Sequence, residues 1–168
     1  ESYYATILLS GIVLDTNNYT LNTTAETYYS SYYLSSLGAS AKKVQYLLKQ
    51  DIEDYKERQK LLTDIEIING KVAFTKATSS IVYRKEDIAR VADTLLFFNN
   101  IEASFVIGKI GKDTIGISAR SLGNFDIVKI LSKLGGGGDT YNGAAQIEKS
   151  TISKVEQELK RLLKEDGE

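Results

Sequence analysis

The sequence lacks both cysteine and histidine. Without cysteine, the chain has no disulfide framework, no thiolate zinc site and no cysteine nucleophile. Without histidine, it cannot by itself build a Ser-His-Asp triad, a histidine-ligated zinc site or an imidazole acid–base pair. Any metal ion that this chain binds must therefore be held by oxygen ligands, which favours magnesium, manganese or calcium.

Methionine is also absent, even at position 1, so we expect the natural start of the protein to lie upstream. No apolar run approaches the roughly 20 residues of a membrane span, and the first residues show no signal-peptide pattern. The 21 basic and 22 acidic residues nearly cancel, which argues against binding to nucleic acids or membranes through bulk charge. A hydrophobic content of 42% in 168 residues is typical of a soluble globular protein.

The first part of the chain predicts the C-terminal end of a parallel-sheet α/β domain. Residues 3–10 form the end of an apolar helix, and residues 11–14 form a short buried strand that delivers Asp15 to the edge of the sheet. A tyrosine-rich helix over 26–37, closed by Gly38, completes this part. We assign residues 1–40 to this domain.

A long helix over residues 42–63, capped by Ser40, predicts a connector spanning 41–64. The remainder, 65–168, reads as a separate small α/β domain with a mixed sheet. Its expected strands are 65–68, 72–75, 103–110, 114–120 and 144–148, and its expected helices are 86–98, 125–134 and 152–164. Asn69 and Gly70 between the first two strands indicate a type I′ hairpin.

Two motifs have residue types that suit chemistry. Asp15 is either the cap of a turn or a ligand for a hard cation, since carboxylates at strand ends often hold such ions. Arg120, flanked by Ser118 and Ser121, suits a phosphate because a guanidinium donates two parallel hydrogen bonds. The alternative is a surface arginine that pairs with an acid such as Asp126.

Four consecutive glycines, Gly135 to Gly138, follow the helix expected over 125–134. Only about 30 residues come after them, too few for a further domain, which argues against a flexible linker. A loop without side chains lets backbone N–H groups approach an anion. Asp139 at the end of the loop is suited to cap the turn that follows.

Six segments, taken together in this order, carry a family resemblance: LLSGIVLDT (8–16), YYLSSLGA (32–39), DIEDYKERQKLL (51–62), ASFVIGK (103–109), GISARSLGNFDIV (116–128) and LGGGGDTYNGAAQI (134–147). They resemble the DHH family of phosphoesterases with its DHH-associated domain. In particular, they resemble the C-terminal half of the GdpP-type cyclic-di-AMP phosphodiesterases, over essentially the whole chain.

The resemblance implies a manganese-dependent hydrolase that cleaves cyclic dinucleotides with two metal ions. Asp15 matches the last metal-ligand aspartate of the catalytic domain. The substrate-binding candidates are Ser118, Arg120, Ser121, Gly135, Gly136, Gly137, Gly138 and Asn142. No catalytic residue is assigned within this chain, because the family's other metal ligands lie upstream of it.

The sequence departs from the family pattern at three positions. Asp139 stands where the family has histidine, and Asn22 and Glu26 stand where it has arginines. Three hypotheses therefore remain: part of a working phosphodiesterase that is inactive as this chain alone, a degenerate member that binds nucleotides without hydrolysing them, or a structural or oligomerisation module. The exposed-looking tyrosines of the helix over 26–37 are the basis of the third hypothesis.

The partners implied are a cyclic or linear dinucleotide, the missing N-terminal half of the catalytic domain, and a second copy in a homodimer. The resemblance also implies a cytoplasmic location with no direct membrane contact by this chain.

Overall fold

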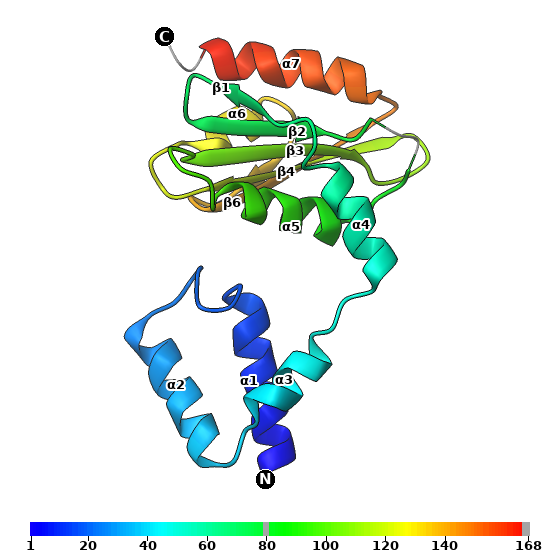
Figure 1. Ribbon diagram of the computed structural model, residues 1–168. Coiled ribbons are helices and arrows are strands. Elements are labelled where there is room, and N and C mark those ends of the chain that lie inside the picture. Colours follow the sequence, from blue (N-terminus) through cyan, green and yellow to red (C-terminus); the bar gives the residue numbers. More distant parts are fainter. Residues whose placement is uncertain (79–80, 166–168) are drawn as a thin grey trace. The chain divides into compact units, whose positions relative to one another are not determined.

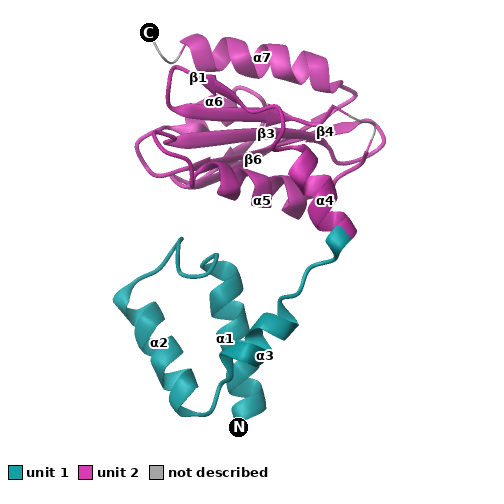
Figure 2. Ribbon diagram, viewed as in Figure 1, with its two compact units in different colours: residues 1–52 teal, residues 53–168 magenta. Residues whose placement is uncertain are grey.

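The computed structural model describes residues 1–78 and 81–165 and divides into two compact units, 1–52 and 53–168 (Figure 2). The division falls inside the segment expected to form the connector. Each unit has its own hydrophobic core. No helix in the described ranges is both long and apolar enough to cross a membrane.

Unit 1 consists of the helices α1 (Ser2–Asp15), α2 (Ala25–Ser36) and α3 (Ala41–Leu47). Its small core is formed by Ala5 and Leu9 of α1, Leu34 of α2 and Val44 of α3. The helix ends follow the sequence signals. Gly38 after α2 has a φ of 88°, and the Ser40 hydroxyl accepts a hydrogen bond from the Lys43 amide at the start of α3.

The prediction of a strand over residues 11–14 is wrong, because these residues form the last turn of α1. The helix is apolar around its whole circumference, so its sequence shows no helical periodicity that would distinguish it from a buried strand. The Thr6 and Thr16 hydroxyls each bond to the carbonyl oxygen four residues earlier, within the helix. The described residues of unit 1 contain no strand, so the parallel sheet expected there is not part of this unit.

The prediction of a single connector helix is also wrong. The segment forms two helices, α3 and α4 (Ile52–Lys60), which are separated at residues 48–51. Glu53 and Asp54 lie in the first turn of α4, where negative charges stabilise the partial positive charge of a helix N-terminus. This acidic start favours a new helix at Ile52 over the continuation of α3.

Unit 2 is built on a six-stranded sheet with the order β1-β2-β3-β4-β6-β5 (Figure 1). The strands are β1 (Glu66–Ile68), β2 (Val72–Lys76), β3 (Ala103–Lys109), β4 (Thr114–Ser121), β5 (Gly137–Gly138) and β6 (Asn142–Glu148). Among the strand pairs of the described residues, β2–β3 is parallel and the other four are antiparallel. α5 (Lys85–Leu95) connects β2 and β3. The prediction of a small α/β domain with a mixed sheet is confirmed.

Helices cover both faces of this sheet. α6 (Ile127–Ser132) and α7 (Ile152–Glu165) pack on one face, against residues such as Phe74 and Phe105, and α5 packs on the other (Figure 1). The Ser104 hydroxyl of β3 donates a 2.7 Å hydrogen bond to the Ala92 carbonyl of α5, which fixes the helix on the sheet. The face that carries α5 is called the α5 face below.

The predicted hairpin between β1 and β2 is confirmed. Asn69 and Gly70 have φ values of 53° and 71°, as a type I′ turn requires at both central positions. The second half of the glycine tract differs from expectation: Gly137 and Gly138 form the edge strand β5, which pairs with β6 instead of forming a loop.

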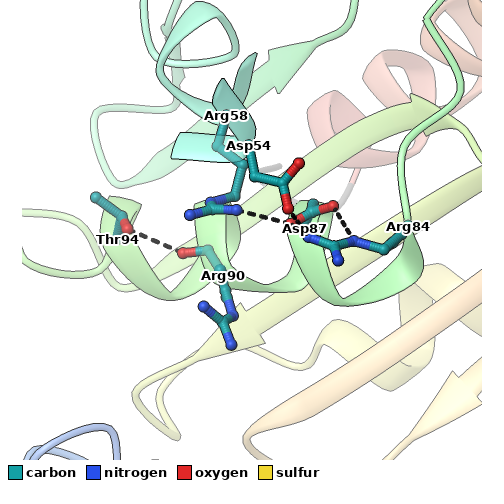
Figure 3. A network of polar contacts seen from close by, with 6 residues as sticks. All are labelled: Asp54, Arg58, Arg84, Asp87, Arg90 and Thr94. Carbon is teal, nitrogen blue, oxygen red and sulfur yellow. Dashed lines mark hydrogen bonds and ion pairs between the residues drawn. The ribbon is translucent and has the colours of Figure 1, made fainter. Parts of the chain in front are cut away.

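A network of ion pairs fixes α4 to the N-terminal turn of α5 (Figure 3). Arg58 donates a 2.9 Å hydrogen bond to Oδ1 of Asp87, and both residues are buried. Arg84 bridges Oδ2 of Asp87, at 2.8 Å, and Oδ2 of Asp54, at 2.7 Å. Burial alone raises the pKa of Asp87, but the hydrogen bonds from Arg84 and Arg58 outweigh it and hold this pKa below its ordinary value.

The helical state of residues 11–14 is tested by Gly11→Ala. An added Cβ meets no atom of the described residues within 4 Å, and alanine favours a helix over glycine by about 0.5–1 kcal/mol. We expect hydrogen exchange of the α1 amides to slow. Gly38→Ala is the control and should speed it, because Gly38 has a positive φ and its added Cβ would lie 3.2 Å from Cβ of Ser2. Faster exchange in Gly11→Ala would contradict the helix.

The buried ion pair predicts a large loss of stability in Arg58→Met, by about 3–5 kcal/mol, because the Asp87 charge is left with one partner fewer. Lys56→Met on the same helix removes an exposed pair with Glu53 and should change the free energy of unfolding by less than about 0.5 kcal/mol. Denaturant titration of the two variants measures the difference, and equal effects would contradict the prediction.

The same pair predicts a pH dependence. Because the pKa of Asp87 is lowered in the folded state, its contribution is fully present above the ordinary aspartate pKa and is lost as the pH falls through the folded value. Loss of Arg58 raises the folded pKa, so we expect Arg58→Met to unfold at a higher pH than the wild type in an acid titration. An unchanged acid midpoint would show that the pair does not perturb Asp87.

Candidate functional site

A pocket of about 440 Å³ opens on the α5 face of unit 2, beside the first turns of α5. Its walls come from α5, β4, β6 and β5. The lining residues are Lys85, Glu86, Ile88, Ala89, Ile110, Gly116, Ile117, Ser118, Arg120, Gly137, Gly138, Asn142, Gly143, Ala144, Ala145 and Gln146. Isoleucine, alanine and glycine form most of the wall, and a few polar groups interrupt it, which is the usual composition of a small-molecule site.

Five of the substrate-binding candidates meet in this pocket, although they come from three strands. Ser118 and Arg120 come from β4, Gly137 and Gly138 from β5, and Asn142 from the start of β6. The register explains this arrangement: β6 pairs with β4 on one side and with β5 on the other, with Ala144 opposite both Ser118 and Gly137. Ser121, Gly135 and Gly136 do not line the pocket.

Arg120 is held in one orientation by several hydrogen bonds. Its Nε donates to Oδ1 of Asp93 at 2.6 Å, and its Nη1 donates to the Ser118 hydroxyl at 3.2 Å and to the Ala119 carbonyl at 2.9 Å. Within the described ranges, Nη2 donates to no group. The Arg120 side chain is 15% exposed and that of Asp93 20%, so water only partly screens this ion pair. Its partner is thus Asp93 of α5 and not Asp126, which caps α6.

The two serines beside Arg120 lie on opposite faces of the sheet. Ser118 is buried, faces the pocket and accepts a hydrogen bond from Arg120, which leaves its O–H free to donate toward a ligand. Ser121 alternates to the other face, where its hydroxyl donates to the Phe125 carbonyl and accepts from the Gly123 amide. Ser121 therefore shapes the turn before α6.

The four glycines of the tract have different surroundings. Gly135 has a φ of 75° and ends α6, a conformation that other residues rarely adopt. A Cβ on Gly136 would lie 2.3 Å from the Ala144 carbonyl oxygen, and a Cβ on Gly138 would lie 2.1 Å from that of Asn142. The fold accounts for these three. Gly137 differs, because a Cβ there would meet no atom of the described residues within 4 Å and its φ is unstrained.

Asp139 organises the turn between β5 and β6. Its Oδ1 accepts hydrogen bonds from the amides of Tyr141, at 2.7 Å, and Asn142, at 2.8 Å. The bond from the Tyr141 amide, followed by that from Asn142, lowers the pKa of Asp139. Asp139 thus caps the turn as expected, and its carboxylate accepts hydrogen bonds from the backbone of that turn.

Asp15 belongs to no metal-binding cluster of the described residues. It is exposed at the end of α1, in unit 1, and not at the end of a strand. Among residues 1–78 and 81–165, no group of three or more acidic side chains is placed to hold a metal ion. One carboxylate does not make a site for two manganese ions, so the residues of this chain alone do not fit that cofactor.

Several pocket residues carry no direct signal in the sequence. Asp93, the partner of Arg120, lies 27 positions away on a helix, and only the packing of α5 on the sheet brings the two together. Lys85 and Glu86 read as ordinary charged residues of a helix start. Gly116, in the interior of β4, does carry a signal, since a glycine inside a strand often marks a close approach to other atoms.

Comparison with known proteins identifies relatives of this chain. The cyclic-di-AMP phosphodiesterase GdpP of Geobacillus thermodenitrificans is 42% identical over 159 residues, which are 95% of this chain and 24% of that protein. The cyclic-di-AMP phosphodiesterase PdeA of Listeria monocytogenes is 42% identical over 155 residues, 92% of this chain and 24% of that protein. The chain thus spans about a quarter of the length of these relatives, in their C-terminal region.

A solved structure shares the fold. It belongs to an exopolyphosphatase-related protein from Bacteroides fragilis, matches with a TM-score of 0.81 at 18% identity, and covers 97% of this chain and 50% of the other. The DHHA1 domain family matches residues 69–165, which include every residue of the pocket. The resemblance to DHH phosphoesterases with a DHH-associated domain is confirmed, and the chain belongs to the DHHA1 domain family.

Proposed function

We propose that this chain is the substrate-holding C-terminal portion of a cyclic-dinucleotide phosphodiesterase and that the pocket on the α5 face binds a nucleotide of the substrate. The relatives named as cyclic-di-AMP phosphodiesterases support the substrate class. The pocket lies within the segment that matches the DHHA1 domain, and its volume falls in the range of roughly 300–1,000 Å³ that is usual for small-molecule sites.

Gly137 is the observation that carries this proposal. The fold requires glycine at the other three positions of the tract, but it does not require one at Gly137. Glycine at an unstrained position costs conformational entropy on folding, so it needs another reason. A ligand that approaches the backbone at the pocket wall supplies that reason.

The polar groups of the pocket suit a phosphate. Nη2 of Arg120 and the O–H of Ser118 donate to no group of the described residues, and both side chains line the pocket. Because the other donors of Arg120 are already held, a phosphate gains these hydrogen bonds with little loss of side-chain freedom. Ile88, Ala89 and Ile110 form an apolar wall against which a base would lose contact with water.

Manganese is part of the proposal only for the complete enzyme. Asp15 would be one of several oxygen ligands, and the others would come from residues outside this chain. We expect the purified chain to show no turnover of cyclic-di-AMP with manganese present, because one carboxylate cannot hold two ions. A cytoplasmic location of the pocket also belongs to the proposal and rests on the family resemblance.

The proposal predicts a selective effect of Gly137→Ala. The added methyl group enters the pocket without touching the described protein, so the melting temperature should be unchanged or slightly raised. Affinity for cyclic-di-AMP should fall at least about tenfold, since one displaced ligand contact costs over about 1.4 kcal/mol. Arg120→Ala should lose affinity similarly. Isothermal titration calorimetry measures both variants.

Arg90→Ala is the matched control, because Arg90 lies on α5 but does not line the pocket. It should bind as the wild type does. Equal affinities of the wild type, Gly137→Ala and Arg120→Ala would remove the pocket from the nucleotide site. Absence of binding to the wild type would contradict the proposed function as a whole for this chain.

A further inference from the structure

The positive charge of Arg120 is already paired before a ligand arrives. Asp93 of α5 accepts the Nε hydrogen bond at 2.6 Å, and both side chains are largely shielded from water. Asp93 itself does not line the pocket, so it acts on a ligand only through Arg120 and through its charge. A paired guanidinium still donates hydrogen bonds, but it attracts an anion less strongly than a free one.

The other charges around this part of the pocket do not restore a positive field. Lys85 on the wall is matched by Glu86, its neighbour in the first turn of α5. The Asp139 carboxylate is close enough to Arg120 to be influenced by its charge. Among these side chains, two cations are thus accompanied by three carboxylates.

We infer that Asp93 determines which phosphate the pocket accepts: it positions Arg120 for hydrogen bonding and, by neutralising it, makes the pocket favour a phosphodiester over a terminal phosphate. This inference rests on the proposed function of the same pocket. A phosphodiester carries one negative charge, whereas a terminal phosphate carries between about 1.5 and 2 at pH 7. Each additional negative charge is opposed by Asp93, Glu86 and Asp139 without a matching cation.

This preference fits the direction of the reaction. Hydrolysis of a phosphodiester adds water across a P–O bond and yields a hydroxyl group and a terminal phosphate. The product therefore carries more negative charge than the substrate at the phosphate that reacts. A pocket that disfavours the additional charge binds a nucleotide that carries only phosphodiesters more tightly than one that carries a terminal phosphate.

The test compares two ligands that differ in one charge, adenosine 5′-monophosphate and its methyl phosphodiester. Calorimetry at constant ionic strength measures both on the wild type, Asp93→Asn and Asp93→Ala. The wild type should bind the methyl diester more tightly. In Asp93→Asn an amide oxygen still accepts the hydrogen bond from Nε of Arg120, but the negative charge is lost. Affinity for the monophosphate should therefore rise about tenfold relative to affinity for the diester. This is the change expected when one charge about 6 Å from the phosphate is removed at an effective dielectric constant of about 40.

Asp93→Ala removes the hydrogen-bond acceptor as well, so Arg120 loses its position. Affinity for the diester should then fall severalfold in Asp93→Ala, whereas Asp93→Asn should keep the affinity of the wild type for the diester. This rescue by the isosteric variant separates positioning from a purely structural ion pair. Asp113→Asn, an exposed aspartate outside the pocket, is the matched control and should leave the ratio of the two affinities unchanged.

An unchanged ratio in Asp93→Asn, or an equal loss of both ligands in Asp93→Asn and Asp93→Ala, would overturn the inference while the proposed function stands. Tighter binding of the monophosphate than of the diester by the wild type would overturn it without any variant. If the wild type binds neither of these ligands nor cyclic-di-AMP, it is the proposed function that fails.

Discussion

The strand β4 lies between β3 and β6, and the alternation of its side chains sets what each face of the sheet can do. Ile115, Ile117 and Ala119 point into the core formed with α6 and α7. Gly116, Ser118 and Arg120 point to the α5 face and line the pocket. A shift of one residue in this register would bury Arg120 in an apolar core and expose the isoleucines. The large core on one face therefore fixes the polar groups on the other.

Three further ion pairs complete the site. Asp93 holds Arg120 from α5, and the ion pairs of Arg58 and Arg84 with Asp87 fix the start of the same helix. The pocket wall formed by α5 is thus anchored at its first turn and toward its end. The glycine tract closes the opposite wall, because Gly136 and Gly138 pack without side chains against the backbone of β6. A ligand would meet a preformed wall on both sides.

Much of unit 2 could be predicted from the sequence because its signals are local. The turn at Asn69-Gly70, the strands around Gly111 and the amphipathic α7 depend on residues that are neighbours in the chain. The grouping of Ser118, Arg120, Gly137 and Gly138 was also predictable through the family resemblance. The Asp93–Arg120 pair was not, since it depends on tertiary packing. The prediction of a strand over residues 11–14 is wrong because this segment is uniformly apolar. Such a segment has no periodicity that distinguishes a buried strand from a helix that is apolar on all sides.

Unit 1 has a much smaller core, formed by Ala5, Leu9, Leu34 and Val44. Large apolar side chains remain exposed on it, among them Leu8, Tyr29 and Tyr32. Exposed patches of this kind are typical of surfaces that contact other protein. The hypotheses of a further catalytic-domain segment and of a second copy both concern this surface.

The central claim is that the pocket on the α5 face binds a nucleotide. Two-dimensional amide NMR of the isotopically labelled chain during titration with cyclic-di-AMP tests it most directly. The account predicts saturable shifts at Ser118, Gly137 and Gly138, with Leu159 and Leu163 on the opposite face unchanged. Shifts confined to the face that carries α6 and α7, or to unit 1, would contradict it.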